Sequence, residues 1–395
     1  MFMHTKRFLL FCGIIIFTFS MLVSCTRMPP PSTSEHRPIE PLVAGNGIQL
    51  GELHLRGRFS VLNPEMKVFS LSLSDDGECI LFSSEARLIS KLDDAGNLLW
   101  EMVSPGLPIS AALAADGSYA AVGTDQGEVY YVNDSGRIVW DKSFQGRIEH
   151  LIIDNASDRL LLSASEEEHS TIYCLKRLSG DLLWEMETGP LQDLFFISGE
   201  EIYYLEKYLE QEEAVSSLKA VLQGELVWEM PALLARFSAN GAYLVLISGN
   251  ELQYCTLGAD GQPYLLWSSL VPDGGEVSWL GLTENGRCLL AYNESAAENN
   301  NLRAYSQEGL LLWEQRIPGG ALLDFSSSGE RIVACSWQEY SEDFSKVIVL
   351  DSVGEIMQEV GMASRIEKIT LSGDGTILVL AGNDGNLFIL DIPNP

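Results

Sequence analysis

The sequence has 395 residues, 46% of them hydrophobic, which is enough to bury either two ordinary cores or one large repeat architecture. It contains 55 Asp and Glu residues against 25 Lys and Arg, a formal net charge of −30 at pH 7. Such a surface repels phosphate backbones and anionic lipid headgroups, which argues against nucleic acid and against electrostatic attachment to an anionic membrane.

The N-terminus has the pattern of a bacterial export signal. Lys6 and Arg7 precede an uncharged run, residues 8–24, that is shorter than the roughly 20 residues that comfortably span a bilayer. The run ends in Leu22-Val23-Ser24-Cys25, which resembles the lipobox of bacterial lipoproteins. We therefore expect residues 1–24 to be a signal peptide that is removed. The resemblance implies that Cys25 is lipidated and anchors the protein to a membrane without spanning it.

Residues 25–41 are expected to form the lipidated cysteine and a tether, because five prolines lie there among Ser, Thr and charged residues and no apolar periodicity is present. A polyproline-like segment rises about 3.1 Å per residue, so the tether would hold the folded body away from the bilayer. The predicted location is extracytoplasmic, at either the plasma membrane or the outer membrane. The prolines are Pro29, Pro30, Pro31, Pro38 and Pro41.

An internal repeat dominates the remaining sequence. Its unit is a glycine, a variable residue, two mostly apolar residues and a tryptophan, as in residues 96–100 and 309–313. Two degenerate copies place Leu55 and Gln358 at the tryptophan position. The eight anchor positions are 39 to 46 residues apart, the interval expected for one four-stranded propeller blade. We expect the repeat tryptophans to pack between neighbouring sheets, with each indole N–H donating to a backbone acceptor. They are Trp100, Trp140, Trp184, Trp228, Trp267 and Trp313.

Each interval also contains three short runs rich in β-formers, separated by turn sequences such as Asp76-Gly77. Only one strand-like segment, residues 52–56, precedes the first full repeat. Three such runs follow the last anchor and end near residue 391. The sequence therefore predicts an all-β fold for residues 42–395: an eight-bladed β-propeller of four-stranded antiparallel blades. Pairing of the N-terminal strand with the three C-terminal strands would close the ring and remove its unpaired edges.

Residues 123–140 and 382–388 resemble the quinoprotein-type (PQQ-like) propeller repeat, a WD40-like architecture, and the resemblance covers about residues 48–395. Quinone-dependent dehydrogenases of this type have a vicinal cysteine pair, which this sequence lacks. Their calcium-binding carboxylate and catalytic base match no motif here. Eight blades with a lipid anchor also look like the propeller lipoprotein of the outer-membrane β-barrel assembly machinery, an adaptor that scaffolds other proteins.

Other catalytic and metal-binding signals are missing from the sequence. The five histidines lack zinc-ligand spacing, and no Cys-x-x-Cys, phosphate-binding loop or nucleophile motif occurs. We therefore expect no catalytic residues, no metal and no cofactor. The mature cysteines beyond Cys25 lie in strand-like runs, and the sequence leaves open whether Cys288 and Cys335 form a disulfide.

Irregular loops mark the face on which a partner is expected to bind. In a four-stranded blade, the loop between the second and third strands shares a face with the connection to the next blade. Long polar loops fall there, and function on repeat scaffolds concentrates in such loops. They span residues 165–170, 206–217, 293–301 and 336–346.

Within the last of these loops, Trp337, Tyr340 and Phe344 alternate with acidic residues and form a candidate hot spot for a partner. In the alternative interpretation, Trp337 ends a buried strand and the other two fold back on the blade. The sequence thus favours a monomeric, non-catalytic scaffold that binds an unidentified protein or glycan. The alternatives are a quinone-dependent dehydrogenase, detectable by dye-linked activity, and a cell-envelope sensor, detectable by a transcriptional response.

Overall fold

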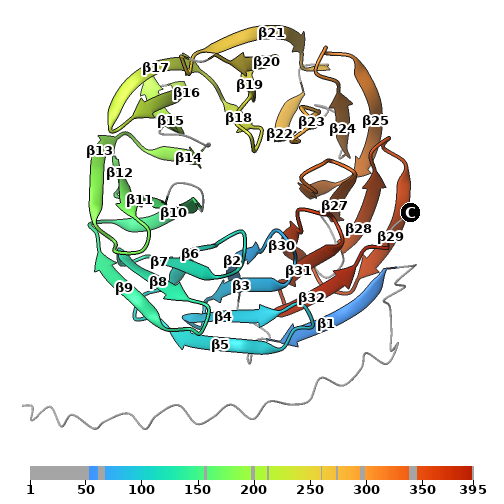
Figure 1. The fold of residues 1–395 in the computed structure, drawn as a ribbon. Helices are drawn as coiled ribbons and strands as arrows, with labels where there is room; N and C mark the ends of the chain where they lie inside the picture. Colours follow the sequence, from blue (N-terminus) through green and yellow to red (C-terminus); the bar gives the residue numbers. More distant parts are fainter. Residues whose placement is uncertain are drawn as a thin grey trace, which may run out of the picture. The chain divides into compact units, whose positions relative to one another are not determined.

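The computed structural model describes residues 53–60, 67–154, 158–196, 201–210, 213–258, 260–272, 275–293, 299–337 and 345–393. The chain divides into two units, residues 1–40 and 41–395, and all of the described residues belong to the second. They form 32 strands in eight four-stranded antiparallel sheets. The sheets stand radially around a ring, with the first strand of each nearest the centre (Figure 1). The predicted eight-bladed propeller is confirmed.

The blades are numbered along the chain. Blade 1 contains β2 (Val68–Leu73), β3 (Cys79–Ser84), β4 (Leu88–Asp93) and β5 (Leu98–Val103), and blade 2 contains β6 (Pro108–Leu113), β7 (Tyr119–Thr124), β8 (Glu128–Asn133) and β9 (Ile138–Ser143). Blade 3 contains β10 (Arg147–Asp154), β11 (Arg159–Ser165), β12 (Ser170–Lys176) and β13 (Leu182–Thr188), and blade 4 contains β14 (Leu191–Phe196), β15 (Glu201–Glu210), β16 (Glu213–Leu222) and β17 (Glu225–Pro231). Blade 5 contains β18 (Leu234–Phe237), β19 (Tyr243–Ser248), β20 (Glu251–Leu257) and β21 (Pro263–Leu270), and blade 6 contains β22 (Glu276–Leu282), β23 (Cys288–Asn293), β24 (Asn299–Tyr305) and β25 (Leu311–Pro318). Blade 7 contains β26 (Gly320–Phe325), β27 (Arg331–Trp337), β28 (Ser345–Asp351) and β29 (Ile356–Met362), and blade 8 contains β30 (Ile366–Leu371), β31 (Ile377–Gly382), β32 (Asn386–Asp391) and β1 (His54–Ser60).

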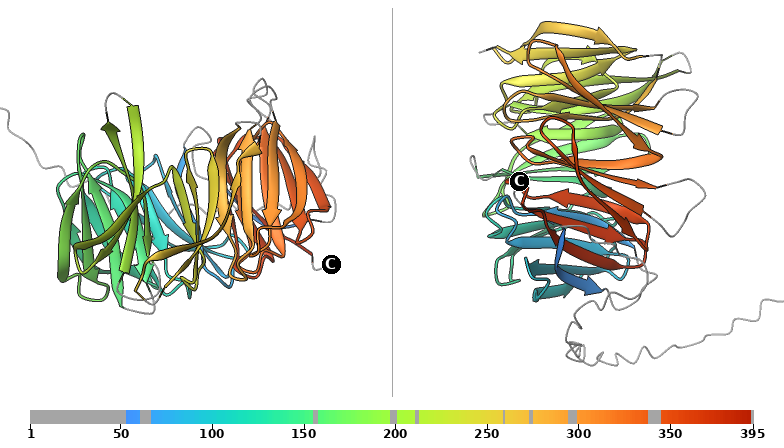
Figure 2. Two further views of the ribbon diagram at one scale, coloured as in Figure 1. Left: turned by 90° about the horizontal axis from the view of Figure 1, so that it is seen from above. Right: turned by 90° about the vertical axis from the view of Figure 1, so that its right-hand side faces the viewer.

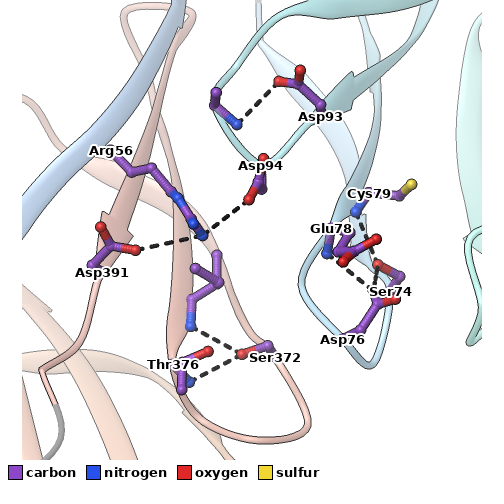
Figure 3. Close-up of polar contacts among 12 residues, drawn as sticks. Arg56, Ser74, Asp76, Glu78, Cys79, Asp93, Asp94, Ser372, Thr376 and Asp391 are labelled. Atoms are coloured by element: carbon purple, nitrogen blue, oxygen red, sulfur yellow. Dashed lines mark hydrogen bonds and ion pairs between the residues drawn. The ribbon is translucent and has the colours of Figure 1, made fainter.

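The ring closes in blade 8, where the first strand of the chain joins the last three. β1 is antiparallel to β32, and the register runs from His54 opposite Asp391 to Ser60 opposite Asn386. Arg56 Nη1 lies 3.1 Å from Asp94 Oδ2 in blade 1 and 3.5 Å from Asp391 Oδ1 in blade 8 (Figure 3). The predicted closure is confirmed, and this ion-pair network bridges the two blades that meet there.

The hydrophobic core lies between the blades, because each sheet packs on a neighbour at both faces. The second strands are accordingly buried along most of their length, as in β27 and β31. One cluster joins Val333 and Val349 of blade 7 to Leu380 of blade 8. This two-sided burial explains why these strands read as continuous apolar runs, without the alternation of a half-exposed sheet.

The repeat glycine and tryptophan meet across the junctions between successive blades from blade 1 to blade 7. Trp267 in blade 5 donates from Nε1 to Gln307 O in blade 6, at 2.8 Å. A Cβ on Gly309, whose φ is +81°, would lie 2.9 Å from the Trp267 ring. The glycine therefore meets two demands, a left-handed turn and room for the preceding blade's indole. Indole N–H bonds to the next blade are also made by Trp140 to Arg177 O at 2.8 Å, Trp228 to Gly261 O at 2.9 Å and Trp313 to Ser352 O at 3.0 Å.

Three of the junctions differ from this pattern. At the junction of blades 7 and 8, Gln358 takes the register position of the tryptophan, as the degenerate repeat predicts. The ring of Trp100 is buried, but its Nε1 has no hydrogen-bond acceptor among the described residues. At the closure, Gly57 lies at the register position that tryptophan takes in other blades, two residues beyond the predicted Leu55. A Cβ on Gly57 would lie 2.3 Å from Ala95 O. Blades 8 and 1 therefore meet through closely packed backbone instead of an indole.

Turns between first and second strands fasten neighbouring blades together. Ser327 N donates to Gly373 O, Gly373 N to Asp75 O, and Asp75 N to Ala115 O, each at 2.9 Å. This chain of backbone bonds crosses the closure and joins blades 7, 8, 1 and 2. Inside these turns a hydroxyl organises the backbone: Ser74 Oγ donates to Asp76 Oδ1 at 2.6 Å and accepts from Cys79 N at 2.9 Å (Figure 3). The Asp-Gly turns are thus structural, as their sequence predicts.

A half-buried carboxylate links the inner strands of blades 7 and 8. Asp324 accepts from Leu371 N at 2.8 Å and from Phe325 N at 2.9 Å. Burial raises the pKa of Asp324 to about 6, although both hydrogen bonds act in the opposite direction.

The two cysteines that the sequence left open as a disulfide do not pair. Cys335 in blade 7 and Cys288 in blade 6 are both buried free thiols.

Candidate interaction face

The ring has two different faces, which we call the turn face and the loop face. The turn face contains the turns from first to second and from third to fourth strands, and Gln307 Nε2 joins two of them by donating to Asn285 O at 2.7 Å. The loop face contains the second-to-third-strand loops and the connections between blades. Backbone hydrogen bonds join the connections to the loops: Ser104 N donates to Arg87 O at 3.0 Å, and Phe144 N donates to Gly127 O at 2.8 Å. The predicted sharing of one face is confirmed.

A cavity of about 730 Å³ opens on the loop face at the junction of blades 3 and 4. Its walls come from three places: the start of β10, the loop between β11 and β12, and the connection that leads into β14. This junction therefore combines a predicted polar loop with a hollow large enough for several side chains. The lining residues are Gly146, Arg147, Glu149, Ser165, Glu166, Glu167, Glu168, His169, Ser170, Pro190 and Leu191.

Local hydrogen bonds hold the loop that forms one wall. Glu166 N donates to His169 O at 2.8 Å, and His169 Nε2 lies 2.9 Å from Glu166 Oε2. Below them, the hydroxyls of Ser165 and Ser170 lie 3.0 Å apart and are buried. Glu167 and Glu168, at the tip of the loop, are exposed to solvent.

Close backbone packing holds the other walls in place. A Cβ on Gly146, whose φ is +99°, would lie 2.7 Å from Ser165 O, so β10 and the loop approach closely only because a glycine is present. On the blade 4 side, Gly189 N donates to Glu206 Oε1, and Lys207 N donates to Pro190 O at 2.9 Å. The buried Glu206 carboxylate also pairs with Lys219 Nζ. The hollow is therefore bounded by well-connected backbone.

Carboxylates outnumber cations in the cavity lining. Glu149 and residues 166–168 contribute four carboxylates, whereas Arg147 is the one lining residue with a permanent positive charge and His169 is charged only when protonated. Glu149 and Arg147 are both exposed. Such a lining is complementary to lysine and arginine side chains of a partner, and Arg147 can hold a partner carboxylate. The chemistry favours recognition of a charged polypeptide.

A long hairpin stands beside the cavity in blade 4. β15 and β16 have ten residues each, against six or seven in the corresponding strands of most blades. Their pairing continues to Glu210 opposite Glu213. The hairpin projects from the loop face, at the upper side of the left view in Figure 2. The sequence predicts a loop insertion at residues 206–217, and the structure places most of it in this ribbon.

The predicted aromatic cluster is described only in part. Trp337 ends β27 opposite Gly320, is half-buried, and has the Arg365 guanidinium carbon 5.2 Å from its ring centroid. Tyr340 and Phe344 lie outside the described residues, as does the lipidation candidate Cys25. Trp337 belongs to blade 7, whereas the cavity lies between blades 3 and 4, so the two candidate regions are separate.

Sequence reasoning identified residues 165–170 but missed Arg147, Glu149 and Pro190 as neighbours of that loop. The available signal was topological: a connection between blades must lie on the same face as the loops. Within the described residues, no group of three or more His, Cys, Asp and Glu side chains is arranged to hold a metal. None of the described segments is a helix long and apolar enough to cross a membrane.

Comparison with known proteins supports the repeat type. Residues 85–229 match the model of a family of PQQ-like repeats described as outer membrane protein assembly factor BamB. The predicted resemblance is confirmed. BamB from Moraxella catarrhalis matches with a TM-score of 0.61 and 13% identity, over 86% of this chain and 100% of that one. No curated protein sequence matches the chain.

Two further solved structures have the same architecture. Sqt1 from Saccharomyces cerevisiae matches with a TM-score of 0.63 and 12% identity, over 87% of this chain and 100% of that one. Sqt1 from Chaetomium thermophilum, solved bound to the N-terminus of the ribosomal protein L10, matches with a TM-score of 0.64 and 12% identity, over 86% of this chain and 100% of that one. At such low identities the likeness concerns the fold.

Proposed function

We propose that the protein is a lipid-anchored, extracytoplasmic scaffold without catalytic activity, and that it binds a partner protein at the loop-face cavity between blades 3 and 4. The proposal rests on the cavity, which has a volume of about 730 Å³, is open to solvent and has four carboxylates in its lining, three of them exposed. A lipid on Cys25 would keep the propeller near a membrane, as the sequence pattern predicts.

Two features support a protein partner over a small substrate. The lining presents charged groups on three separate chain segments, the arrangement that suits a polypeptide with several contacts. The propeller of Chaetomium thermophilum Sqt1 is bound to the N-terminus of another protein, so the architecture accommodates a peptide ligand. Electrostatic complementarity would then favour a partner segment that contains Lys or Arg.

Reversing charges in the cavity tests the proposal. In Glu149→Lys/Glu167→Lys, each substitution replaces an exposed lining carboxylate with a cation. The tagged, full-length protein is purified from membranes together with its partner. We expect the amount of co-purified partner to fall by about tenfold or more, because charges at the rim of a site control encounter and like charges repel. Quantitative mass spectrometry of the recovered proteins provides the measurement.

The matched control is Glu308→Lys/Glu355→Lys, which makes the same charge change at two exposed positions of the turn face. Recovery should stay within about twofold of the wild type, because these positions are remote from the cavity. An equal loss in both double variants would point to a general charge effect and contradict the proposed site. So would unchanged recovery with the cavity variant.

A further inference from the structure

The blade 4 hairpin extends beyond both strands that flank it. β15 pairs with β14 as far as Glu206 opposite Leu191, and β16 pairs with β17 as far as Ser217 opposite Pro231. Beyond these residues β15 and β16 pair only with each other, up to Glu210. Among the described residues, this end of the hairpin is therefore a two-stranded ribbon with no strand along either long edge.

One edge of the ribbon is directed toward the cavity. Lys207 N donates to Pro190 O at 2.9 Å, and Pro190 lines the cavity. The N–H and C=O of one residue in a β-strand point to the same edge of the strand, and those of the next residue point to the other edge. The residue two positions along therefore points its N–H and C=O to the first edge again. Leu209 therefore directs both groups to the side of Pro190, past the first residue of β14. We call residues 207–210 the cavity-side edge.

The opposite edge provides an internal comparison. Ser216 O accepts from Ala232 N at 3.1 Å on the β17 side. By the same alternation, Ala214 directs its N–H and C=O to that side, away from the cavity. Leu209 and Ala214 face each other in the ribbon register. Their N–H groups therefore belong to opposite edges, and neither is used in the ladder between β15 and β16.

We propose that the cavity-side edge binds an extended, basic segment of the partner by β-strand addition. This inference rests on the proposed function and specifies how the partner is held. A strand added antiparallel to β15 would continue the line of β14 and end beside Pro190, at the cavity wall. Main-chain hydrogen bonds along the edge provide affinity, and the carboxylates of the cavity select Lys and Arg.

Charge decides between a basic segment and a second copy of this chain. Beyond the buried Glu206, the sequence from residue 207 to residue 213 contains three glutamates and one lysine. Four more glutamates line the cavity beside it. Pairing with the same ribbon of another copy would bring like charges together, which is unfavourable, whereas a basic segment neutralises them. Unpaired edges are usually protected in proteins, so an open edge next to a charged hollow indicates a binding site.

The experiment uses the full-length protein and a fluorescein-labelled decapeptide of alternating Val and Lys, with binding followed by fluorescence anisotropy. Leu209→Pro removes the N–H from the cavity-side edge, and Ala214→Pro removes its counterpart from the other edge. We expect Leu209→Pro to weaken binding by about tenfold or more and Ala214→Pro to leave it within about twofold. A probe N-methylated at alternate residues should bind the wild type equally weakly.

Each other outcome overturns the proposal. If the N-methylated probe binds the wild type as well as its parent does, strand addition is wrong, whatever the proline variants show. If binding then still falls in Glu149→Lys/Glu167→Lys, the proposed function survives without strand addition. If light scattering shows dimers of the protein alone that Leu209→Pro abolishes, the edge serves self-pairing instead of a basic partner.

Discussion

Replacing Trp267 with alanine is expected to lower the free energy of unfolding by about 3 to 5 kcal/mol. The indole lies at the junction of blades 5 and 6. Its ring centroid is 5.2 Å from that of Tyr254 and 5.8 Å from that of Tyr305. Its Nε1 donates to Gln307 O at 2.8 Å. Alanine would leave a cavity between two blades and a carbonyl without its donor, and both effects destabilise the folded state.

Urea unfolding followed by circular dichroism measures this loss. Trp267→Phe is the matched control, because it keeps an aromatic ring in the stack but removes the N–H donor. Its loss should be smaller, about 1 kcal/mol or somewhat more. If the alanine variant unfolds at the wild-type urea midpoint, Trp267 does not join the blades as described.

Removal of β1 is expected to destabilise the ring by at least about 3 kcal/mol. β1 covers the edge of β32 from Asn386 to Asp391. Leu53, just before it, is 1% exposed, and Phe59 has its ring 5.5 Å from Phe82 in blade 1. A chain lacking residues 1–60 loses this burial and exposes a strand edge that invites association.

The control is a chain lacking residues 1–48, which keeps β1 and also lacks the predicted lipid anchor. Thermal unfolding and size-exclusion chromatography compare the two. The shorter chain should melt at lower temperature and associate, and a synthetic peptide of residues 53–60 should partly restore both properties. Equal melting temperatures and equal elution volumes would mean that β1 does not close the ring.

The fold could be predicted because its repeat encodes two physical requirements. Glycines such as Gly136 and Gly309 adopt positive φ in the turn before the fourth strand. They also leave room for Trp100 and Trp267 of the preceding blades. A spaced glycine and tryptophan therefore report both a turn and a junction between blades. That combination is specific enough to count blades from the sequence.

Local register was harder to predict where the repeat degenerates. Without a tryptophan in β1, spacing alone suggested Leu55, but the bulge shifts Gly57 into that position. The apolar pair of the motif was also ambiguous: Leu311 and Leu312 are 49% and 47% exposed, although their neighbour Trp313 packs at the junction. The apolar residues indicate a strand, but they do not show which side chains are exposed at the outer edge of the blade.

Only part of the candidate site could be predicted from the sequence. Residues 166–168 are charged and interrupt two apolar runs, so the loop between β11 and β12 was predictable. The cavity itself depends on how closely blades 3 and 4 approach, and Gly146 and Pro190 acquire their roles only through that packing. The extended pairing of β15 and β16 was equally hidden, because the segment lacks clear two-residue alternation.

Site-specific photocrosslinking in intact cells tests the central claim, that the loop face at blades 3 and 4 is where a partner binds. A photoreactive amino acid is placed at position 167, in the cavity lining, or at position 308, in a turn on the opposite face. We predict a discrete crosslinked protein from position 167 that is absent from position 308. Equal crosslinking from both positions, or crosslinking from position 308 alone, would contradict the account.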